Sequence, residues 1–203
     1  MLVKHTYRLV WFRGEECNRI HHGLIRAREK EAFGSALVFK IRFSVKEYKG
    51  EKMNLTEEPK TVAWPTTHYV FVEKVGPFQS NAPAAWENLH THVPQIAQHN
   101  QITGYMSLYK MGPKVYRAGV SLAAPPKDLP EGLGYTEFSG GKFSRFVLTG
   151  PYSNLGKATG RVVEIVSETG LPVRDDYFIE NYVNDPRTTP EEQLITEILV
   201  PTA

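Results

Sequence analysis

The sequence predicts an α+β fold of tandem β-α-β-β modules with pseudo-twofold symmetry. The first observation is an internal repeat: VEKVGPFQSNAPAAW and FVLTGPYSNLGKATG align Gly76-Pro77-Phe78 with Gly150-Pro151-Tyr152. The second is that the same elements surround both copies: a strand, a Gly-Pro-aromatic turn, a helix and two strands in a hairpin. Such units join into one antiparallel sheet with both helices on one side. We expect a central groove on the opposite side, at the seam between the modules.

Residues 1–52 differ in composition from the rest of the chain. They hold 12 Lys and Arg against 6 Asp and Glu, whereas residues 53–203 hold 12 against 16. They predict a strand (LVKHTYRLVWF), a weak helix (CNRIHHGLIRAREKEAF) and a second strand (ALVFKIRFSVKEY), followed by the polar linker KGEKMNLTEEP. We interpret 1–52 as a dispensable basic extension, either genuine or included by the choice of start codon, and 53–203 as one complete domain.

The first module is expected to begin with HYVFVEKVG, a strand rich in aromatic and β-branched residues. GPFQSN is then a turn and APAAWENLHTHVPQIA a helix. Pro83 falls near the first turn of that helix, where proline is tolerated, and Pro94 is expected to end or kink it. ITGYMSLYK and VYRAGVSLA follow as strands joined by the hairpin signal MGPK.

The second module repeats this order after the proline-containing loop APPKDLPEGLG. KFSRFVLTG is a strand, GPYSN a turn, and LGKATGRVVEIVSETG a helix that ends at Gly170. YFIENYVND and LITEILVP are strands separated by the loop DPRTTPEEQ. The glycines of EGLGYTEFSGGKF lack the Lys-Ser/Thr and the helix of a phosphate-binding loop, so we assign them to hairpin turns.

Glu180 interrupts a run of apolar, aromatic and amide side chains in YFIENYVNDP. Residues two apart on a strand share a face, so Glu180 lies on the face of Phe178 and Tyr182. A carboxylate between two aromatic rings is costly when it is buried without a partner. Either it faces water or a Lys or Arg of the protein, or a positively charged group from outside comes to it.

Five motifs in this order resemble the GyrI-like effector-binding domain over about residues 53–203. They are the paired GPF and GPY turns, the Ala85-Trp86 pair, EGLGYTEFSGGKFSRF, IENYVNDP and TEILVP. That domain forms the C-terminal half of several bacterial AraC-type and MerR-type transcription activators and also occurs alone, as in integron-cassette members. The resemblance implies two β-α-β-β modules with a ligand cleft between them. No DNA-binding half is recognisable, so we expect no direct nucleic-acid binding.

The resemblance further implies a cleft for bulky, apolar and often cationic compounds, in which Glu180 takes the role of the acidic residue. A carboxylate offsets the cost of removing a cation from water, and aromatic rings add cation–π attraction. We therefore expect Glu180 to be partly buried, with a raised pKa in the empty site. The aromatic residues expected to line the cleft are Tyr182, Phe178, Tyr69, Phe71, Tyr105, Tyr109, Trp86 and Trp64. The alternative for each is ordinary core packing, and Glu197 is a second acidic candidate.

Composition excludes several other classes of protein. No apolar run approaches the roughly 18 residues of a membrane span, and the N-terminus lacks the features of a signal peptide. Cys17, the one cysteine, cannot form an internal disulfide, and it favours a reducing, cytoplasmic location. No Cys/His spacing predicts a metal site, Asp175-Asp176 suits a solvated turn, and we expect no cofactor.

Three functions remain open. The first is binding of a cationic aromatic compound for sensing or sequestration. The second, which the resemblance to GyrI-like proteins implies, is hydrolysis of strained-ring electrophilic toxins, with Glu180 as general base and Tyr105 or Tyr182 as donor. The third, also suggested by that resemblance, is inhibition of a DNA topoisomerase by direct interaction. The sequence shows no Ser/His/Asp or Cys/His arrangement, so we favour binding and assign no catalytic residue.

Overall fold

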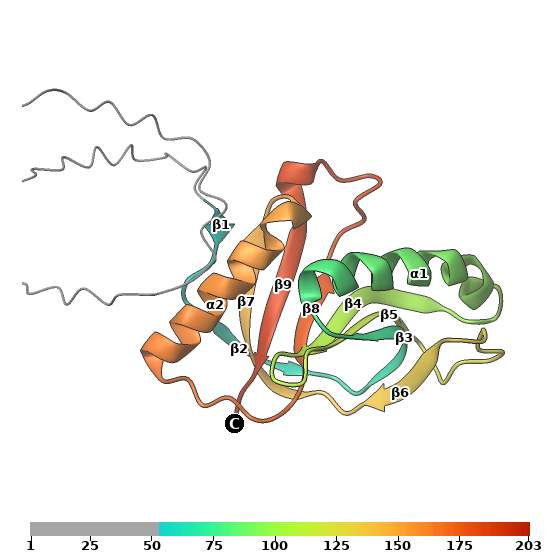
Figure 1. Cartoon of the computed structure of the whole chain (residues 1–203), viewed down its shortest axis with the longest axis horizontal. Helices are drawn as coiled ribbons and strands as arrows, with labels where there is room; N and C mark the ends of the chain where they lie inside the picture. The colour runs from blue at the N-terminus through green and yellow to red at the C-terminus, as the bar shows by residue number, and fades with distance from the viewer. Residues whose placement is uncertain (1–52) are drawn as a thin grey trace, which may run out of the picture. The chain divides into compact units, whose positions relative to one another are not determined.

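The computed structural model describes residues 53–203, so the elements expected within residues 1–52 lie outside it (Figure 1). The strands are β1 (Asn54–Leu55), β2 (Lys60–Trp64), β3 (Thr67–Val75), β4 (Ile102–Lys110), β5 (Val115–Leu122), β6 (Gly134–Phe138), β7 (Gly141–Thr149), β8 (Phe178–Tyr182) and β9 (Ile195–Pro201). The helices are α1 (Phe78–His99) and α2 (Leu155–Thr169), with 3-10 turns η1 (Tyr152–Asn154) and η2 (Glu191–Gln193).

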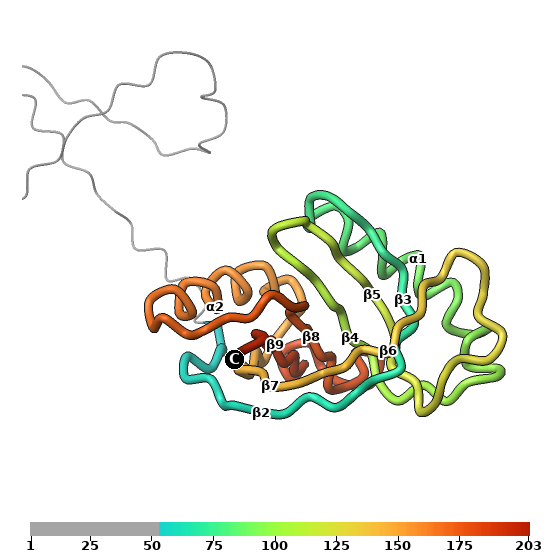
Figure 2. Tube along the Cα trace, turned by 90° about the horizontal axis from the view of Figure 1, so that it is seen from below, coloured from blue at the N-terminus to red at the C-terminus, as the bar shows by residue number. Residues whose placement is uncertain are grey.

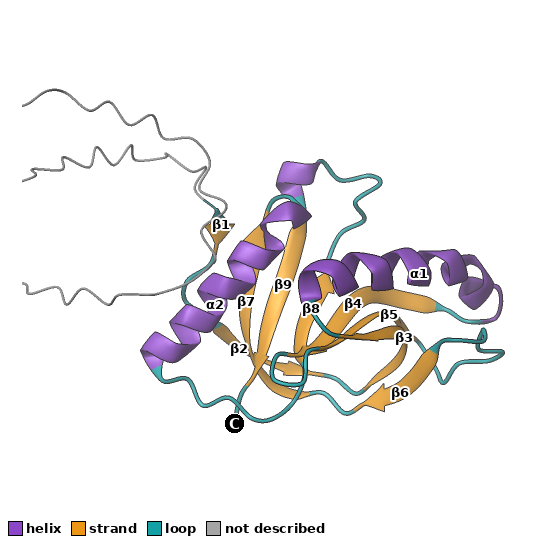
Figure 3. Ribbon diagram, viewed as in Figure 1, coloured by secondary structure: helices purple, strands orange, loops and turns teal. Residues whose placement is uncertain are grey.

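The nine strands of the described residues belong to one antiparallel sheet, and the prediction of an α+β fold is confirmed (Figure 3). The strand order is β1-β7-β9-β8-β4-β5-β3-β6, with β2 also paired to β7. The first module is β3-α1-β4-β5 and the second is β7-α2-β8-β9. They meet at the β4–β8 ladder, which runs between the two helices (Figure 1). Both helices pack on the same face of the sheet, each over its own module.

The two Gly-Pro-aromatic turns have the same backbone conformation, which supports the internal repeat. Gly76 has φ 129° and Gly150 has φ 131°, values that side chains rarely allow. Each is followed by an extended proline, Pro77 with φ −58° and Pro151 with φ −64°. The aromatic residue after each proline opens the helical segment of its module. The repeat in sequence is therefore also a repeat in structure.

The helix-free face of the sheet carries a core, and the prediction of a groove there was wrong. The chain of β2 continues into β3, and that of β6 into β7. The β2–β7 ladder therefore continues the β3–β6 ladder. Together the two ladders bend the sheet over its own helix-free face (Figure 2). The residues packed beneath it are Tyr69, Phe71, Met106, Leu108, Phe138, Phe143, Ile179 and Leu199. These side chains fill the space in which the groove was expected.

Helix α1 begins earlier and runs further than the sequence indicated. It starts at Phe78 rather than Ala82, and it contains both Pro83 and Pro94 without ending at either. Its fully buried residues Leu89 and Ile96 lie on both sides of Pro94 and pack on the sheet. Tertiary packing of this apolar face stabilises the helix across the proline, which local propensity alone would not predict.

The strand β6 and the short strands β1 and β2 were not expected. The sequence GYTEF was assigned to glycine-rich turns, but it pairs with β3 from Thr67–Phe138 to Phe71–Gly134. Glycine is required where it faces Phe71, since a Cβ on Gly134 would lie 2.6 Å from that ring. Trp64, expected on the approach to the first strand, instead ends β2.

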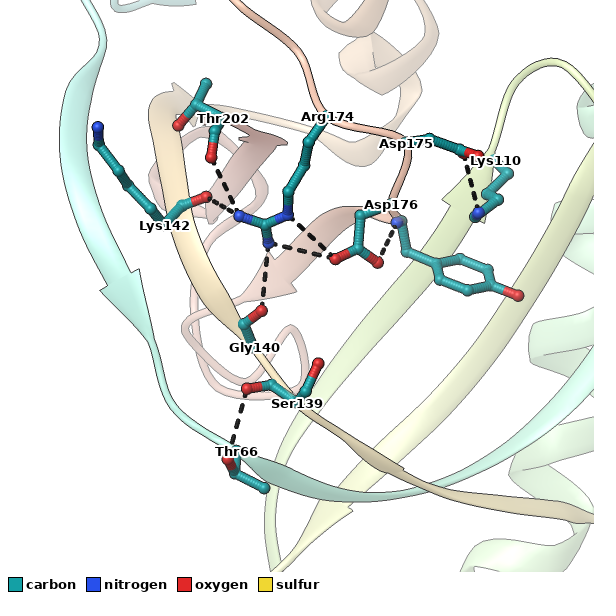
Figure 4. A network of polar contacts seen from close by, with 10 residues as sticks. Thr66, Lys110, Ser139, Gly140, Lys142, Arg174, Asp175, Asp176 and Thr202 are labelled. Atoms are coloured by element: carbon teal, nitrogen blue, oxygen red, sulfur yellow. Dashed lines mark hydrogen bonds and ion pairs between the residues drawn. The ribbon is translucent and has the colours of Figure 1, made fainter.

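Arg174 fixes the segment that leads into β8 (Figure 4). Its guanidinium donates to the carbonyl oxygens of Lys142 at 2.9 Å, Thr202 at 3.0 Å and Gly140 at 3.2 Å. It also donates to the Asp176 carboxylate from Nε and Nη2. The beginning of β7 and the residue that follows β9 are thus joined to the segment before β8, so the start of β8 is held in register.

Candidate functional site

A cavity of about 1400 Å³ lies on the helix-bearing face, between α1 and the start of α2. Its floor is formed by β4 and β8, and residues of the loop after β8 also line it. This volume exceeds the roughly 300–1,000 Å³ of most small-molecule pockets. The aromatic residues that line it are Phe78, Trp86, Tyr105, Tyr109, Tyr116, Tyr152 and Tyr182. The cavity therefore suits a bulky apolar ligand, and it occupies the seam between the modules on the face opposite to that expected.

A row of cross-strand pairs at the junction of the modules forms and supports the floor of the cavity. Tyr105 faces Tyr182, Ser107 faces Glu180, and Tyr109 faces Phe178. The Ser107–Glu180 pair occupies the middle of this row, between two pairs of aromatic residues. The pseudo-twofold relation between β4 and β8 is thus broken at its centre, where one strand contributes a carboxylate and the other a small hydroxyl.

Glu180 is a buried carboxylate that forms no ion pair with the Lys, Arg or His residues of 53–203. Its exposed fraction is 8%, and its Oε2 accepts a hydrogen bond from the Tyr182 hydroxyl at 3.0 Å. Burial raises the pKa of Glu180, and the hydroxyls of Tyr182, Ser107 and Thr159 oppose that rise. The direction of the pKa shift is the one expected from the sequence, whereas the side chain is more fully buried than expected.

Tyr182 connects the walls of the cavity to its floor. The Trp86 ring from α1 meets it edge-on, with centroids 5.1 Å apart and planes at 90°. The Tyr152 ring from the second module meets it at 5.3 Å and 82°. Such edge-to-face pairs are favourable geometries for aromatic rings. Both modules therefore hold the ring whose hydroxyl reaches Glu180.

The loop after β8 contributes an ion pair to the cavity lining, in which Arg187 and Asp185 bond to each other. Arg187 donates from Nε to Oδ1 of Asp185 at 3.0 Å and from Nη2 to Oδ2 at 2.7 Å. The bonds from Arg187 lower the pKa of Asp185 to about 2. The pair is close to neutral as a unit, so Glu180 supplies the unbalanced negative charge among the carboxylates that line the cavity.

The structure brings together five of the nine residues expected at the site: Glu180, Tyr182, Tyr105, Tyr109 and Trp86 all line the cavity. Phe178 lies on the same face but packs into the core beside the cavity, stacked on Tyr109 with centroids 5.6 Å apart. It supports the floor without lining the cavity itself.

The remaining three aromatic candidates need correction. Tyr69 and Phe71 lie in the core on the helix-free face, because they alternate along β3 with Val70 and Val72, which face α1. Trp64, at the end of β2, packs against the same core. Tyr69 is fully buried there and donates to the carbonyl oxygen of Met106 at 2.9 Å.

Glu197, the second acidic candidate, also lies away from the cavity. Its carboxylate accepts hydrogen bonds from Arg145 at 2.9 Å and from Asn181 at 2.8 Å. Asn181 neighbours Glu180 on β8, and successive residues of a strand face opposite ways. Glu197 therefore has a structural partner on the helix-free face.

Several lining residues were missed by sequence reasoning, although two left a signal. Tyr116 pairs with Tyr109 across the β4–β5 hairpin, and the register of the MGPK turn could have placed it. Tyr152 corresponds to Phe78 in the repeat, and both line the cavity. Thr159 in α2 carried no comparable signal, because its role depends on how that helix approaches Glu180.

The described residues offer no set of metal ligands: 53–203 contain no cluster of three or more His, Cys, Asp or Glu side chains placed to hold an ion. Within the same residues, neither helix has the length and apolar character needed to cross a membrane.

Fold and site together define an α+β ligand-binding domain with an aromatic cavity around a buried carboxylate. A model of the GyrI-like small molecule binding domain matches residues 57–203, and the chain belongs to this family. A comparison with curated proteins found no match.

Two solved structures show the same fold at low sequence identity, and a third is similar to this chain. The C-terminal domain of EcmrR is 13% identical with a TM-score of 0.60, over 72% of this chain and 97% of that one. SAV2435 bound to tetraphenylphosphonium is 14% identical with a TM-score of 0.56, over 72% and 94%. An integron cassette protein from the mobile metagenome of Vibrio cholerae is 14% identical with a TM-score of 0.48, over 74% and 99%.

Proposed function

We propose that this protein binds bulky, apolar, cationic aromatic small molecules, with Glu180 as the counter-charge, for sensing or sequestration. The observation that carries the proposal is a buried carboxylate without an ion-pair partner among the described residues, on the floor of an aromatic cavity. A cation that enters the cavity loses hydration, and attraction to Glu180 in a poorly polarisable environment offsets that loss. An anion of the same shape gains no such compensation.

The aromatic walls supply the second part of the affinity. Trp86, Tyr105 and Tyr152 are among the aromatic residues that line the cavity. Cation–π attraction contributes roughly 0.5–2 kcal/mol for each well-placed ring and does not require fixed hydrogen-bond geometry. The site selects ligands by charge, aromatic surface and size rather than by a particular set of hydrogen-bond donors, so it accepts a range of ligands of this class. The tetraphenylphosphonium bound to SAV2435 is a compound of this chemistry.

The test uses two ions of nearly the same shape and opposite charge, tetraphenylphosphonium and tetraphenylborate, titrated calorimetrically into the full chain. We expect roughly micromolar binding of the phosphonium and at least about a hundredfold weaker binding of the borate. Glu180→Gln should remove most of that preference while leaving the cavity's shape unchanged. Equal binding of the two ions, or a preference that survives Glu180→Gln, would contradict the proposal.

Glu197→Gln is the matched control, since it makes the same chemical change in a neighbouring strand of the sheet. The Glu197 carboxylate pairs with Arg145 and lies on the helix-free face. We therefore expect the preference for the phosphonium over the borate to persist in this variant. Loss of the preference in both variants would assign it to the overall charge of the protein rather than to the cavity.

A further inference from the structure

A chain of four hydrogen bonds runs beneath the cavity from α1 to Glu180. The Trp86 indole nitrogen donates to the Tyr116 hydroxyl at 3.0 Å. The Tyr116 and Ser107 hydroxyls lie 2.7 Å apart, and the Ser107 and Tyr182 hydroxyls 3.1 Å apart. The Tyr182 hydroxyl then donates to Glu180 Oε2 at 3.0 Å. The chain crosses three strands and ends at the proposed counter-charge.

The chemistry of its two ends fixes the direction of every bond in the chain. An indole N–H can only donate, and an ionised carboxylate can only accept. Tyr182 gives its proton to Glu180, so the bond between Ser107 and Tyr182 uses the Ser107 proton. The bond between Ser107 and Tyr116 then uses the Tyr116 proton, while the Tyr116 oxygen accepts from Trp86. All four donors thus point toward the carboxylate, and hydrogen bonds aligned in this way polarise and strengthen one another.

We propose that Ser107 and Tyr116 are positioning residues of the ligand site, which hold the Tyr182 hydroxyl as a donor to Glu180 and so keep a charged carboxylate in place for the ligand. This inference deepens the proposed function and rests on it for the identity of the ligand. Ser107 is fully buried and does not line the cavity, so it acts through its neighbours Tyr182 and Glu180 rather than through contact with a ligand.

The small side chain opposite Glu180 suits this role for a physical reason. A serine leaves space for two tyrosine hydroxyls to converge, and it can accept from one while it donates to the other. An alanine would leave the Tyr116 proton without its acceptor and the Tyr182 oxygen without its donor. The buried carboxylate would then be stabilised by a weaker donor, and protonation would become easier.

The groups that face Glu180 come from every element around it. Tyr182 lies on its own strand, Tyr109 on β4 and Tyr116 on β5, and each has a pKa raised mainly by burial. The neutral hydroxyls are those of Ser107 on β4 and Thr159 on α2. Farther out, the cavity is lined by His90 of α1 and by the Asp185–Arg187 pair of the loop after β8.

The test measures the protonation of Glu180 directly in the empty full-length protein, by the pH titration of its side-chain carboxyl carbon in NMR spectra. Glu180→Gln identifies the signal by its loss. We expect Ser107→Ala to raise the titration midpoint by about half to one pH unit. This is the shift that corresponds to the free energy of one hydrogen bond. Tyr116→Phe should raise it less, because Ser107 can still donate to Tyr182.

Ser144→Ala is the matched control, since it removes a buried serine hydroxyl from β7, outside the cavity lining. It should leave the midpoint where it is in the wild type. A folded Ser107→Ala protein with an unchanged midpoint would overturn the proposal. Should Ser107→Ala fail to fold, Tyr116→Phe decides: a raised midpoint supports the proposal and an unchanged one overturns it.

Ligand titrations separate this inference from the proposed function. In Ser107→Ala, the pH at which tetraphenylphosphonium affinity falls by half should move upward together with the NMR midpoint, while Ser144→Ala keeps the wild-type profile. If the wild-type protein does not bind the phosphonium, the proposed function is contradicted. The NMR midpoints would still decide the role of Ser107. Phosphonium binding that depends on Glu180 but has the same pH profile in Ser107→Ala would contradict the positioning role alone.

Discussion

Glu180→Gln should stabilise the empty protein at neutral pH, although it removes the residue on which ligand binding depends. The wild-type carboxylate is buried without an ion-pair partner in the described domain. The glutamine has nearly the same shape and keeps an oxygen that can accept the hydrogen bond from Tyr182. The substitution therefore removes a buried charge while preserving most of the packing around it.

The sign of the effect follows from proton linkage. Burial raises the folded-state pKa of Glu180 above the ordinary value of 4.5, so the folded state holds this proton more tightly than the unfolded chain. Stability that this group contributes is fully present below the unfolded pKa and is lost as the pH rises through the folded pKa. Glutamine does not titrate. The stability difference between the variant and the wild type should thus grow with rising pH.

The expected size is about 1 to 3 kcal/mol at neutral pH, the desolvation penalty of a buried polar group without a full set of partners. With a urea m-value on the order of 2 kcal/mol per molar, the midpoint should rise by roughly 0.5–1.5 M. Urea unfolding of both proteins at about pH 4 and about pH 8 measures this. A variant that is less stable at the higher pH, or a difference that is the same at both, would refute the reasoning.

Four further outcomes are expected. Tetraphenylphosphonium affinity should fall about tenfold for each pH unit below the folded pKa of Glu180, and a flat calorimetric pH profile would contradict this. Trp86→Ala should weaken phosphonium binding by roughly 0.5–2 kcal/mol, whereas Tyr69→Phe, on the helix-free face, should leave the dissociation constant unchanged. Gly119→Ala should lower stability by about 1–3 kcal/mol in thermal unfolding, because its Cβ would lie 2.4 Å from the Val70 carbonyl oxygen; an unaltered melting temperature would count against this. Arg174→Met should destabilise by about 1–3 kcal/mol, since three backbone carbonyls lose a donor, while Arg187→Met, whose ion pair is exposed at the arginine, should leave the stability nearly unchanged.

The internal repeat made most of the fold predictable. A turn of Gly, Pro and an aromatic residue constrains the backbone strongly, so two copies at Gly76 and Gly150 indicated the order of elements around them. The long alternating strands were found for the same local reason. The strand β6 and the bend between β2 and β3 depend on pairing between residues more than sixty positions apart. No local pattern carries that information.

The carboxylate at the centre of the site was predictable from the sequence, whereas the aromatic residues around it were only partly so. Glu180 stood out because a carboxylate within an aromatic strand needs a reason. The alternation of β4 and β8 also placed Tyr105 and Tyr182 on one face. The same alternation could not say which face of β3 meets a helix and which meets the bent sheet, so Tyr69 and Phe71 were assigned to the site although Val70 and Val72 face α1. Hydrolysis and topoisomerase inhibition stay predictions from sequence.

The most direct test of the central claim is a crystal structure with tetraphenylarsonium, which has the shape and charge of the phosphonium and an arsenic atom that anomalous scattering can locate. We expect the arsenic in the cavity between α1 and α2, within about 6 Å of aromatic ring centroids and with Glu180 as the nearest carboxylate. Soaked crystals of Glu180→Gln should show little or no arsenic there. An arsenic position on the helix-free face, or equal occupancy in both proteins, would contradict the claim that Glu180 is the counter-charge of the ligand.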